Sequence, residues 1–473
     1  MNSCWGQRAA GQSLVRQALT WACAMQEDWQ DAESHVEKAH ELFDRGKWEA
    51  ALKELRAAIR TNPYNHLWHF DMGVMLDQLG RFDEAVTAFR KAVDLQADDI
   101  ESLNALGIDL TRTGAPQAAL ECFERCEKLD SAYEPSYCNR IMAYSDLGDH
   151  DKAEQMFYLA RQITDECPFC SFNLGESLYR RAQYDRAISC WKQVIRTDPD
   201  HGDVHYRLAL AYWGKNDIRL ARRHFREQLR RDPGHIDALL DLARLDLNRR
   251  PEAAREKFRF ALELDPANAF AWSLLGEAEY RLGRMGRAEV ALRRSLRMDP
   301  EQTWVRIGLA QIALDRGQAD RVAELVREEL ALKHDQLDVL EQAADLARGA
   351  HHFDLARQAY LAMLAIDPKD VPANEGLAGV LVDLEQFAPA ADQCRHTLEL
   401  EPGSAEAMTQ LAEALIGLGQ FDEAQKLVTR GLTLHPDNGY LKLLRDQIPQ
   451  ARADKAGSVL HRLLTWRKSH PQR

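Results

Sequence analysis

Apolar side chains recur three and four residues apart along the segment 66–97, which is the spacing of one face of an α-helix. They are Met72, Gly73 and Leu76 in the first half and Ala85, Phe89 and Ala92 in the second. Between the halves, Gly80-Arg81-Phe82 is typical of a turn. The pattern therefore predicts a helical hairpin. Because a single hairpin cannot bury both apolar faces, it also predicts neighbouring hairpins.

The same pattern returns every 34 residues along most of the chain. Two kinds of position mark the repeat, namely glycines in the turn and small residues on the second helix. They are Gly46, Gly80, Gly114 and Gly148 in the turns, and Ala51, Ala85, Ala119, Ala153, Ala187 and Ala221 on the second helices. A fixed period of this size is typical of a solenoid, in which each repeat packs mainly against its two neighbours.

The residues at these positions resemble those of the tetratricopeptide repeat family. Its first-helix Leu-Gly pair has counterparts at Leu106-Gly107, Leu174-Gly175 and Leu275-Gly276, and its large-residue row has counterparts at Leu76, Tyr144 and Tyr212. Its helix-ending proline is matched by Pro63, Pro199, Pro233, Pro266, Pro300, Pro368, Pro402 and Pro436. The resemblance implies an all-α fold, a right-handed superhelical solenoid of about twelve helix-turn-helix repeats with a capping helix at each end.

The register of the repeats divides the chain into four segments. Residues 1–31 precede the repeats and are expected to form an N-terminal capping segment. Residues 32–436 form the tandem array, and residues 437–450 form a C-terminal capping helix. Residues 451–473 form a basic tail, whose apolar residues offer a short face for a partner or an anionic membrane. The preferred interpretation of this tail is a loosely held terminus.

The seventh repeat is one residue short, since Pro233 to Pro266 is a step of 33 residues. The missing residue falls in the turn 248–251, and Pro251 is expected to begin the second helix, where a proline costs little. Two consequences remain open, a tighter turn without further effect and a local change of superhelical angle.

Composition and charge restrict the classes of partner and the compartment. The 473 residues carry a formal net charge of −13, which argues against non-specific nucleic-acid binding because that binding needs a basic surface. No apolar run approaches the roughly 20 residues of a transmembrane helix. Nine cysteines without a secreted-domain spacing favour a reducing compartment, so we expect a cytoplasmic protein. The alternative is export, because Ala22-Cys23-Ala24 resembles a signal-peptidase site that ends near Ala24.

The sequence contains no recognisable catalytic motif, so we expect a protein that is not an enzyme and needs no cofactor. The segment Cys167-Pro168-Phe169-Cys170 keeps a thiol or metal role open. A C-x-x-C at the start of a predicted helix places thiols where the helix dipole lowers their pKa, and its spacing suits a metal ion. Six cysteines gather in this region: Cys122, Cys126, Cys138, Cys167, Cys170 and Cys190. Because no second C-x-x-C follows, ordinary buried cysteines are the preferred interpretation.

In the tetratricopeptide repeat family, the exposed face of the first helices lines a concave groove, and the resemblance implies that this groove binds a partner. Its predicted aromatic and polar lining is Phe70, Asn104, Phe169, Phe172, Tyr179, Arg180, Tyr206, Trp213, Arg244, Phe270, Tyr280, Arg281 and Trp304. An acidic C-terminal end is predicted from Asp338, Glu341, Asp345, Glu375, Asp383, Glu406 and Glu413. Aromatic and arginine side chains are enriched at binding hot spots, and acidic ones favour Lys or Arg on a partner.

These residues predict a non-catalytic scaffold that binds extended segments of partner proteins and mediates the assembly of complexes. The expected partner segment carries apolar side chains and, toward one end, basic ones. Some of the aromatic residues are instead expected to fill space between neighbouring first helices. A further alternative is a subunit that presents substrates to a separate catalytic chain, as in relatives fused to sugar-transferase domains. The oligomeric state is left open.

Overall fold

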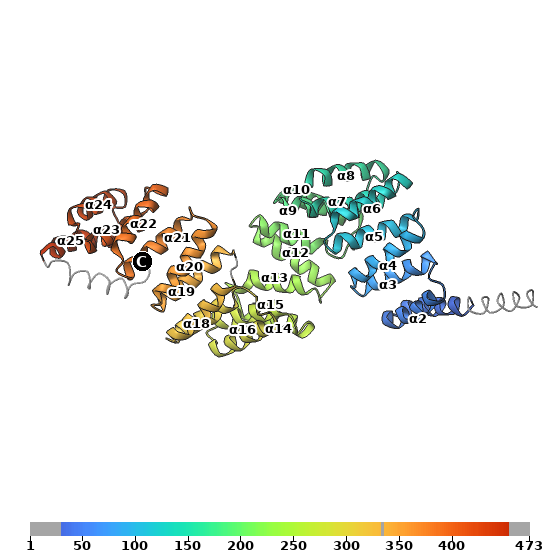
Figure 1. The fold of residues 1–473 in the computed structure, drawn as a ribbon, viewed down its shortest axis with the longest axis horizontal. Helices are drawn as coiled ribbons and strands as arrows, with labels where there is room; N and C mark the ends of the chain where they lie inside the picture. Colours follow the sequence, from blue (N-terminus) through green and yellow to red (C-terminus); the bar gives the residue numbers. More distant parts are fainter. Residues whose placement is uncertain (1–29, 333–334, 454–473) are drawn as a thin grey trace, which may run out of the picture. The chain divides into compact units, whose positions relative to one another are not determined.

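Helices make up all the regular structure within residues 30–332 and 335–453, which are the residues that the computed structural model describes (Figure 1). Consecutive helices pair into antiparallel hairpins, as α3 does with α4 and α5 with α6. The prediction of an all-α solenoid of helical hairpins is therefore confirmed. The chain divides into two compact units, the first ending at Pro233 and the second beginning at Gly234.

The first unit contains six hairpins within its described residues, and its first helix spans residues 30–44. The helices that follow are α2 (Trp48–Thr61), α3 (His66–Gln78), α4 (Phe82–Leu95), α5 (Ile100–Arg112), α6 (Pro116–Leu129), α7 (Glu134–Asp146), α8 (His150–Ile163), α9 (Pro168–Arg180), α10 (Tyr184–Thr197), α11 (Val204–Gly214) and α12 (Ile218–Arg231).

The second unit contains six more hairpins and a final helix within its described residues. Its helices are α13 (Ile236–Leu247), α14 (Pro251–Leu264), α15 (Ala269–Arg281), α16 (Met285–Met298), α17 (Val305–Asp315), α18 (Ala319–Ala331), α19 (Leu337–Gly349), α20 (Phe353–Ile366), α21 (Val371–Asp383), α22 (Phe387–Leu400), α23 (Ala405–Gly417), α24 (Phe421–Leu434) and α25 (Gly439–Ala453). Helix α25 packs on α23 and α24 and buries Leu441 and Leu444, as a C-terminal cap would.

Two predicted segments lie largely outside the described residues. The N-terminal segment 1–31 has only residues 30 and 31 within them, and the basic tail 451–473 has only residues 451–453, which end α25. The signal-like sequence ending near Ala24 lies outside them as well. Among the described residues, no helix is both long and apolar enough to cross a bilayer.

In the first unit, every hairpin turn contains one residue with positive φ, and these residues recur every 34 positions. They are Gly46, Gly80, Gly114, Gly148, Ala182 and Asn216. Glycine adopts this left-handed conformation freely, whereas a Cβ crowds the following carbonyl and costs roughly 1–2 kcal/mol. The Gly80 N–H donates to the Asp77 carbonyl at 2.9 Å, and the Arg81 N–H donates to the Leu76 carbonyl at 2.9 Å. The turn thus caps the last carbonyls of α3, which explains the periodic glycine.

The second unit repeats this turn, with one exception at its first hairpin. Positive φ occurs at Gly283, Gly317, His351, Glu385 and Gly419. The turn between α13 and α14 has no such residue, because Asn248 stays right-handed and the Arg249 and Arg250 N–H groups both donate to the Asp246 carbonyl. Pro251 begins α14, as predicted. The residue missing from the seventh repeat is therefore the left-handed one, and the turn is tighter.

The two helices of a hairpin approach closely where a first-helix glycine faces a large second-helix side chain. A methyl group placed on Gly73 would lie 2.5 Å from the Phe89 ring, and one on Gly175 would lie 2.4 Å from Trp191 Nε1. Neither Phe89 nor Trp191 is appreciably exposed. These contacts hold the two helices of such hairpins close together.

Candidate functional site

Within each unit, several first helices of successive hairpins lie side by side. In the first unit α5 packs beside α7 and α7 beside α9, and in the second unit α15, α17 and α19 do the same. We call the succession of first helices in each unit a row and its solvent-facing side the first-helix face. The residues predicted to bind a partner lie on or next to these helices, so their surroundings determine what the face offers.

The aromatic part of this face, which we call the aromatic segment, lies in the first unit. It consists of Phe169, Phe172, Tyr179, Tyr206 and Trp213 on α9 and α11. Phe169 is the most open of them, with 52% of its surface exposed. The other four are half-buried.

The half-buried members of the aromatic segment pack one side of their rings on the second helices or the adjoining loop. Phe172 stacks on His201 at a centroid distance of 4.5 Å. Tyr206 and Trp213 both lie against the buried Phe225 ring, at 5.9 and 6.2 Å. Tyr179 approaches Tyr184 and Trp191 in the same way. These rings therefore contribute to the packing of the array and remain partly exposed.

Three further predicted residues of the first unit are engaged by neighbours. Phe70 is half-buried, with its ring 5.6 Å from Phe89. Asn104 accepts a hydrogen bond from Asn139 Nδ2 at 2.8 Å. Arg180 is exposed but forms an ion pair with Asp146 at 2.5 Å. Phe70 therefore packs on the second helix of its own hairpin, and the expectation that some aromatics fill space between neighbouring first helices stays a prediction.

In the second unit, arginine and aromatic side chains lie together at the start of the row. The Arg244 guanidinium lies 6.0 Å from the centre of the Phe270 ring and 3.1 Å from Asp241. Phe270 is 46% exposed, so the ring and the cation share an open surface. Planar cations over aromatic faces attract each other through the ring quadrupole.

The neighbouring predicted residues of the second unit are held by polar contacts. The Tyr280 hydroxyl donates to Asp315 at 2.6 Å, and burial together with that carboxylate raises the pKa of Tyr280 to about 12. Arg281 donates to Glu277 and Asn248. Trp304 precedes α17 as its N-cap, with φ of 71° and 39% of its surface exposed, so it presents its ring from a loop.

Three exposed acids of α19, Asp338, Glu341 and Asp345, form what we call the acidic cluster. Their spacing of three and four residues places them on one side of the helix. Partial burial and the nearby charges of Asp345, Asp370 and Asp338 raise the pKa of Glu341. The cluster therefore gathers negative charge on one side of α19.

Two of the other acids predicted for the acidic C-terminal end of the groove have buried carboxylates. Glu413 is buried and accepts a hydrogen bond from the Tyr440 hydroxyl. The Asp383 carboxylate has 5% of its surface exposed and pairs with Arg348 at 3.0 Å. The expectation that these two residues line an open acidic surface is wrong, because both carboxylates are buried and bind side chains of neighbouring helices, Glu413 binding Tyr440 and Asp383 binding Arg348.

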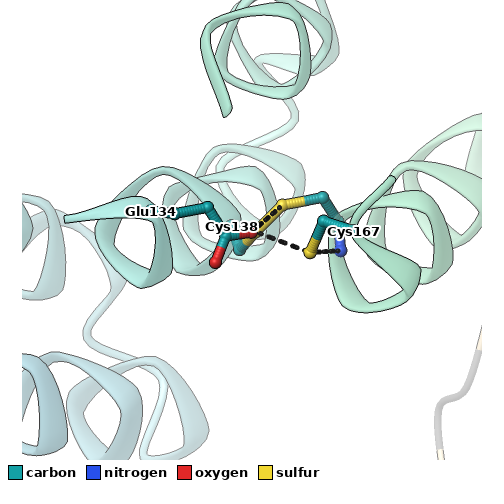
Figure 2. Close-up of side chains that lie close together, drawn as sticks. Glu134, Cys138 and Cys167 are labelled. Carbon is teal, nitrogen blue, oxygen red and sulfur yellow. Dashed lines mark hydrogen bonds between the residues drawn. A yellow bond between two sulfur atoms is a disulfide. The ribbon is translucent and has the colours of Figure 1, made fainter. Parts of the chain in front are cut away.

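Outside the aromatic segment, four metal-ligating side chains meet between α7 and α9, and we call them the thiol cluster (Figure 2). They are Glu134 and Cys138 on α7 and Cys167 and Cys170 at the start of α9. Cys138 and Cys170 form a disulfide. Cys138 Sγ lies 3.6 Å from Cys167 Sγ, and Glu134 Oε1 lies 2.8 Å from Cys138 Sγ and 3.2 Å from Cys170 Sγ.

The reactivity expected for the C-x-x-C motif differs from that in the structure. The Cys170 N–H donates to Cys167 Sγ at 3.2 Å, as an N-cap interaction. Burial, assisted by Glu134, nevertheless raises the pKa of Cys167 to about 11. The predicted lowering of the thiol pKa by the helix dipole is therefore wrong, because desolvation of the thiolate outweighs it.

Sequence reasoning assigned a thiol or metal role only to Cys167 and Cys170. Cys138 was noted among the six cysteines of the region but not as their partner, and Glu134 was missed, because these residues lie 32 and 36 residues before Cys170. In an array with a 34-residue period, side chains separated by nearly one period face each other across adjacent first helices. A search for ligand pairs at that separation, with Glu and Cys four residues apart, would have found the set.

Models of the tetratricopeptide repeat match several parts of the chain. One model matches residues 36–100, 172–236, 206–247 and 242–303, and two others with the same description match residues 303–328 and 385–448. Together these segments cover more than half of the chain.

Several curated proteins are similar to this chain. A tetratricopeptide repeat-containing protein of Bacillus subtilis, YpiA, is 21% identical over 75% of this chain and 84% of its own length. The CTR9 homologue of Arabidopsis thaliana is 23% identical over 66% of this chain and 26% of its own length. The human protein O-mannosyl-transferase TMTC3 is 21% identical over 82% of this chain. The chain spans less than half the length of these last two relatives.

Solved structures resemble the fold at low sequence identity. A tetratricopeptide repeat protein from Parabacteroides merdae gives a TM-score of 0.45 at 18% identity, with 53% of this chain and 99% of that chain covered. Yeast Tom70 gives a TM-score of 0.40 at 17% identity, with 92% of this chain and 99% of that chain covered.

Proposed function

Because this chain belongs to the tetratricopeptide repeat family, whose members bind protein partners, we propose that it is a non-catalytic scaffold that holds extended partner segments on its first-helix face. The observation that carries this proposal is the aromatic segment, above all Phe169, which is 52% exposed on a helix that is otherwise well packed. Large apolar rings left open on a rigid surface are typical of interaction sites.

The half-buried rings of the aromatic segment support this role because their positions are fixed before a partner arrives. The rings of Tyr206 and Trp213 pack against the buried ring of Phe225. A ring held in this way loses little conformational entropy when a partner covers it, so more of the buried apolar area contributes to affinity. The aromatic segment is thus suited to apolar side chains of an extended peptide.

The acidic cluster of the second unit supports a preference for basic side chains. The pKa of Glu341 is raised by partial burial and then by repulsion from Asp345, Asp370 and Asp338. A Lys or Arg of a partner would relieve it. Each unit therefore offers its own recognition chemistry. The aromatic segment of the first unit suits apolar side chains, and the acidic cluster of the second unit suits basic ones.

Affinity capture from host lysate with the full chain tests the proposal. We compare the wild type with Phe169→Ser and with a matched control, Tyr158→Ser, whose ring is 54% exposed on the second helix α8. The expected result is a protein captured by the wild type and the control but lost with Phe169→Ser. Equal capture by all three proteins would show that the aromatic segment is not the binding surface.

A second candidate function is favoured by the match to TMTC3, which is named as a transferase. The chain would then present substrates to a catalytic subunit on another polypeptide. Co-purification with an active transferase, dependent on Phe169, would support this candidate over a purely structural scaffold.

The cellular compartment stays a prediction. The buried cysteines Cys122, Cys126 and Cys394 are outside disulfides, which agrees with a reducing compartment such as the cytoplasm. The Cys138–Cys170 disulfide is more typical of an oxidising one. Fractionation of host cells with an antibody to the chain distinguishes the two.

A further inference from the structure

We infer that the thiol cluster, once its disulfide is reduced, is a binding site for a thiophilic divalent metal ion such as Zn²⁺, with Glu134, Cys138, Cys167 and Cys170 as the four ligands. The proposal does not rest on partner binding at the first-helix face, although Phe169 lies between Cys167 and Cys170 in the sequence. It rests on four donor atoms from two helices that all lie within 4.8 Å of one another. Three sulfurs and one carboxylate make up the soft and borderline donor set that zinc prefers in tetrahedral sites.

The positions of the four ligands on α7 and α9 are those expected of a metal site rather than of unrelated cysteines. Glu134 and Cys138 are four residues apart on α7, which places them on one side of that helix. Cys167 and Cys170 form a C-x-x-C around the N-terminus of α9. Zinc sites commonly draw ligands in two such pairs from adjacent elements. The direct packing of α7 against α9 brings the pairs together.

One sulfur–sulfur distance already matches a tetrahedral site, and the two disulfide sulfurs must separate after reduction. Zinc–sulfur bonds of about 2.3 Å place tetrahedral sulfur ligands about 3.8 Å apart. The Cys138 and Cys167 sulfurs are 3.6 Å apart. Glu134 Oε1 is closer to the sulfurs than a zinc ligand would be, at 2.8 and 3.2 Å, so its half-buried side chain must withdraw by several tenths of an ångström.

Two helix N-termini partly offset the negative charge that such a ligand set carries. Glu134 is the first residue of α7, and Cys167 is the N-cap of α9, so the N-termini of both helices meet at the cluster. Helix N-termini carry partial positive charge and stabilise anions. The Cys170 N–H already donates to Cys167 Sγ at 3.2 Å, a contact that also suits a metal-bound thiolate.

The disulfide and the metal site are alternative states of the same residues, because the Cys138–Cys170 bond occupies two of the four donors. A phosphine reductant breaks that S–S bond and leaves two protein thiols, while the phosphine is oxidised to its oxide with oxygen from water. Binding of Zn²⁺ by three thiolates and the Glu134 carboxylate then releases three thiol protons to solvent.

Metal binding by the full chain tests the inference. Protein purified without metal under phosphine is titrated with Zn²⁺ and, in a parallel sample, with Co²⁺. We expect one zinc per chain by elemental analysis after desalting, and a Co²⁺ absorption spectrum with sulfur-to-metal charge transfer and tetrahedral d–d bands. Removing a direct ligand by Cys167→Ser should weaken binding more than about 100-fold, since even outer-shell partners are worth 10–100-fold.

Two further variants keep the test decisive. Glu134→Gln removes the oxygen ligand at a half-buried position and should weaken binding while circular dichroism shows unchanged helicity. Cys190→Ser is the matched control, because Cys190 is a half-buried free cysteine outside the cluster, and it should bind zinc as the wild type does. Absence of stoichiometric metal in the reduced wild type would overturn the inference. So would full binding by the unreduced chain or by Cys167→Ser.

Discussion

The aromatic segment of the first unit and the acidic cluster of the second differ in how they are tied to the fold. Tyr206 and Trp213 rest on Phe225, so the same rings serve the core and the surface. The acids Asp338 and Glu341 are exposed on α19 and crowd one another. Substitutions in the aromatic segment therefore mix stability with binding, whereas substitutions in the acidic cluster should separate the two. The following experiments test this difference, starting with the largest expected effect.

Trp191 supports the aromatic segment from within the core. Its ring is fully buried between Gly175 and Tyr179, and its indole N–H donates to the Phe172 carbonyl at 3.2 Å. Trp191→Ala should lower the free energy of unfolding by about 3–5 kcal/mol, as expected for a large buried ring. Urea denaturation followed by circular dichroism measures it. Trp48→Ala, at a partly exposed ring, is the control and should cost much less.

The double variant Tyr206→Ala with Trp213→Ala removes two half-buried rings of the aromatic segment. Loss of their contacts with Phe225 should destabilise the chain by about 2–4 kcal/mol in total and also weaken partner binding. Phe169→Ser should weaken binding with a stability change within about 0.5 kcal/mol, since Phe169 is mostly exposed. If all three rings affected stability equally, the distinction between supporting and presenting rings would be wrong.

The left-handed turn residues test whether the two units differ in their scaffold as well as in their surface. Ala182 and Glu385 occupy the same turn position in different units, with φ of 55° and 58°. Ala182→Gly and Glu385→Gly should each raise the free energy of unfolding by about 1 kcal/mol, because glycine relieves the Cβ crowding. Parallel denaturation curves measure both. Equal gains would indicate that the scaffolds behave alike and that only the surfaces differ.

Glu341→Gln should change stability least of these variants. The direction of the change, a gain or a loss, tests the electrostatic interpretation of the acidic cluster. Because the pKa of Glu341 is raised in the folded chain, its ionised form is disfavoured there, and this cost grows as pH rises through that pKa. The variant should therefore melt slightly higher at pH 7, on the order of 1 °C, with the gain vanishing in acid. Calorimetry at several pH values measures it.

The same variant should bind a Lys-rich peptide about two- to fivefold more weakly at low salt, because one attractive charge is removed. Glu324→Gln on the second helix α18 is the control, since that exposed acid pairs with Arg321. A gain of stability together with a loss of binding would identify the acidic cluster as a functional site. A loss of stability would contradict the electrostatic interpretation.

The 34-residue pattern determined most of the fold, because it encodes contacts that are local along the chain. The period of Gly46, Gly80 and Gly114 reflects a turn that needs positive φ, and the small row at Ala85 and Ala119 reflects close helix contacts. Each requirement acts within one hairpin or between adjacent hairpins, so it appears in the sequence as a residue type that recurs with the period of the repeat. The same pattern located the short turn before Pro251.

The site depended on tertiary structure, because its chemistry arises between residues that the sequence separates. The sequence placed Phe169 and Phe270 among candidate binding residues but did not show that Glu413 turns inward to the Tyr440 hydroxyl. It identified Cys167 and Cys170 but not the two ligands that α7 contributes one repeat earlier. Exposure, pairing and desolvation are set by the neighbours that packing supplies. A periodic sequence therefore determines the array, and only the packed array decides which side chains remain open and which meet.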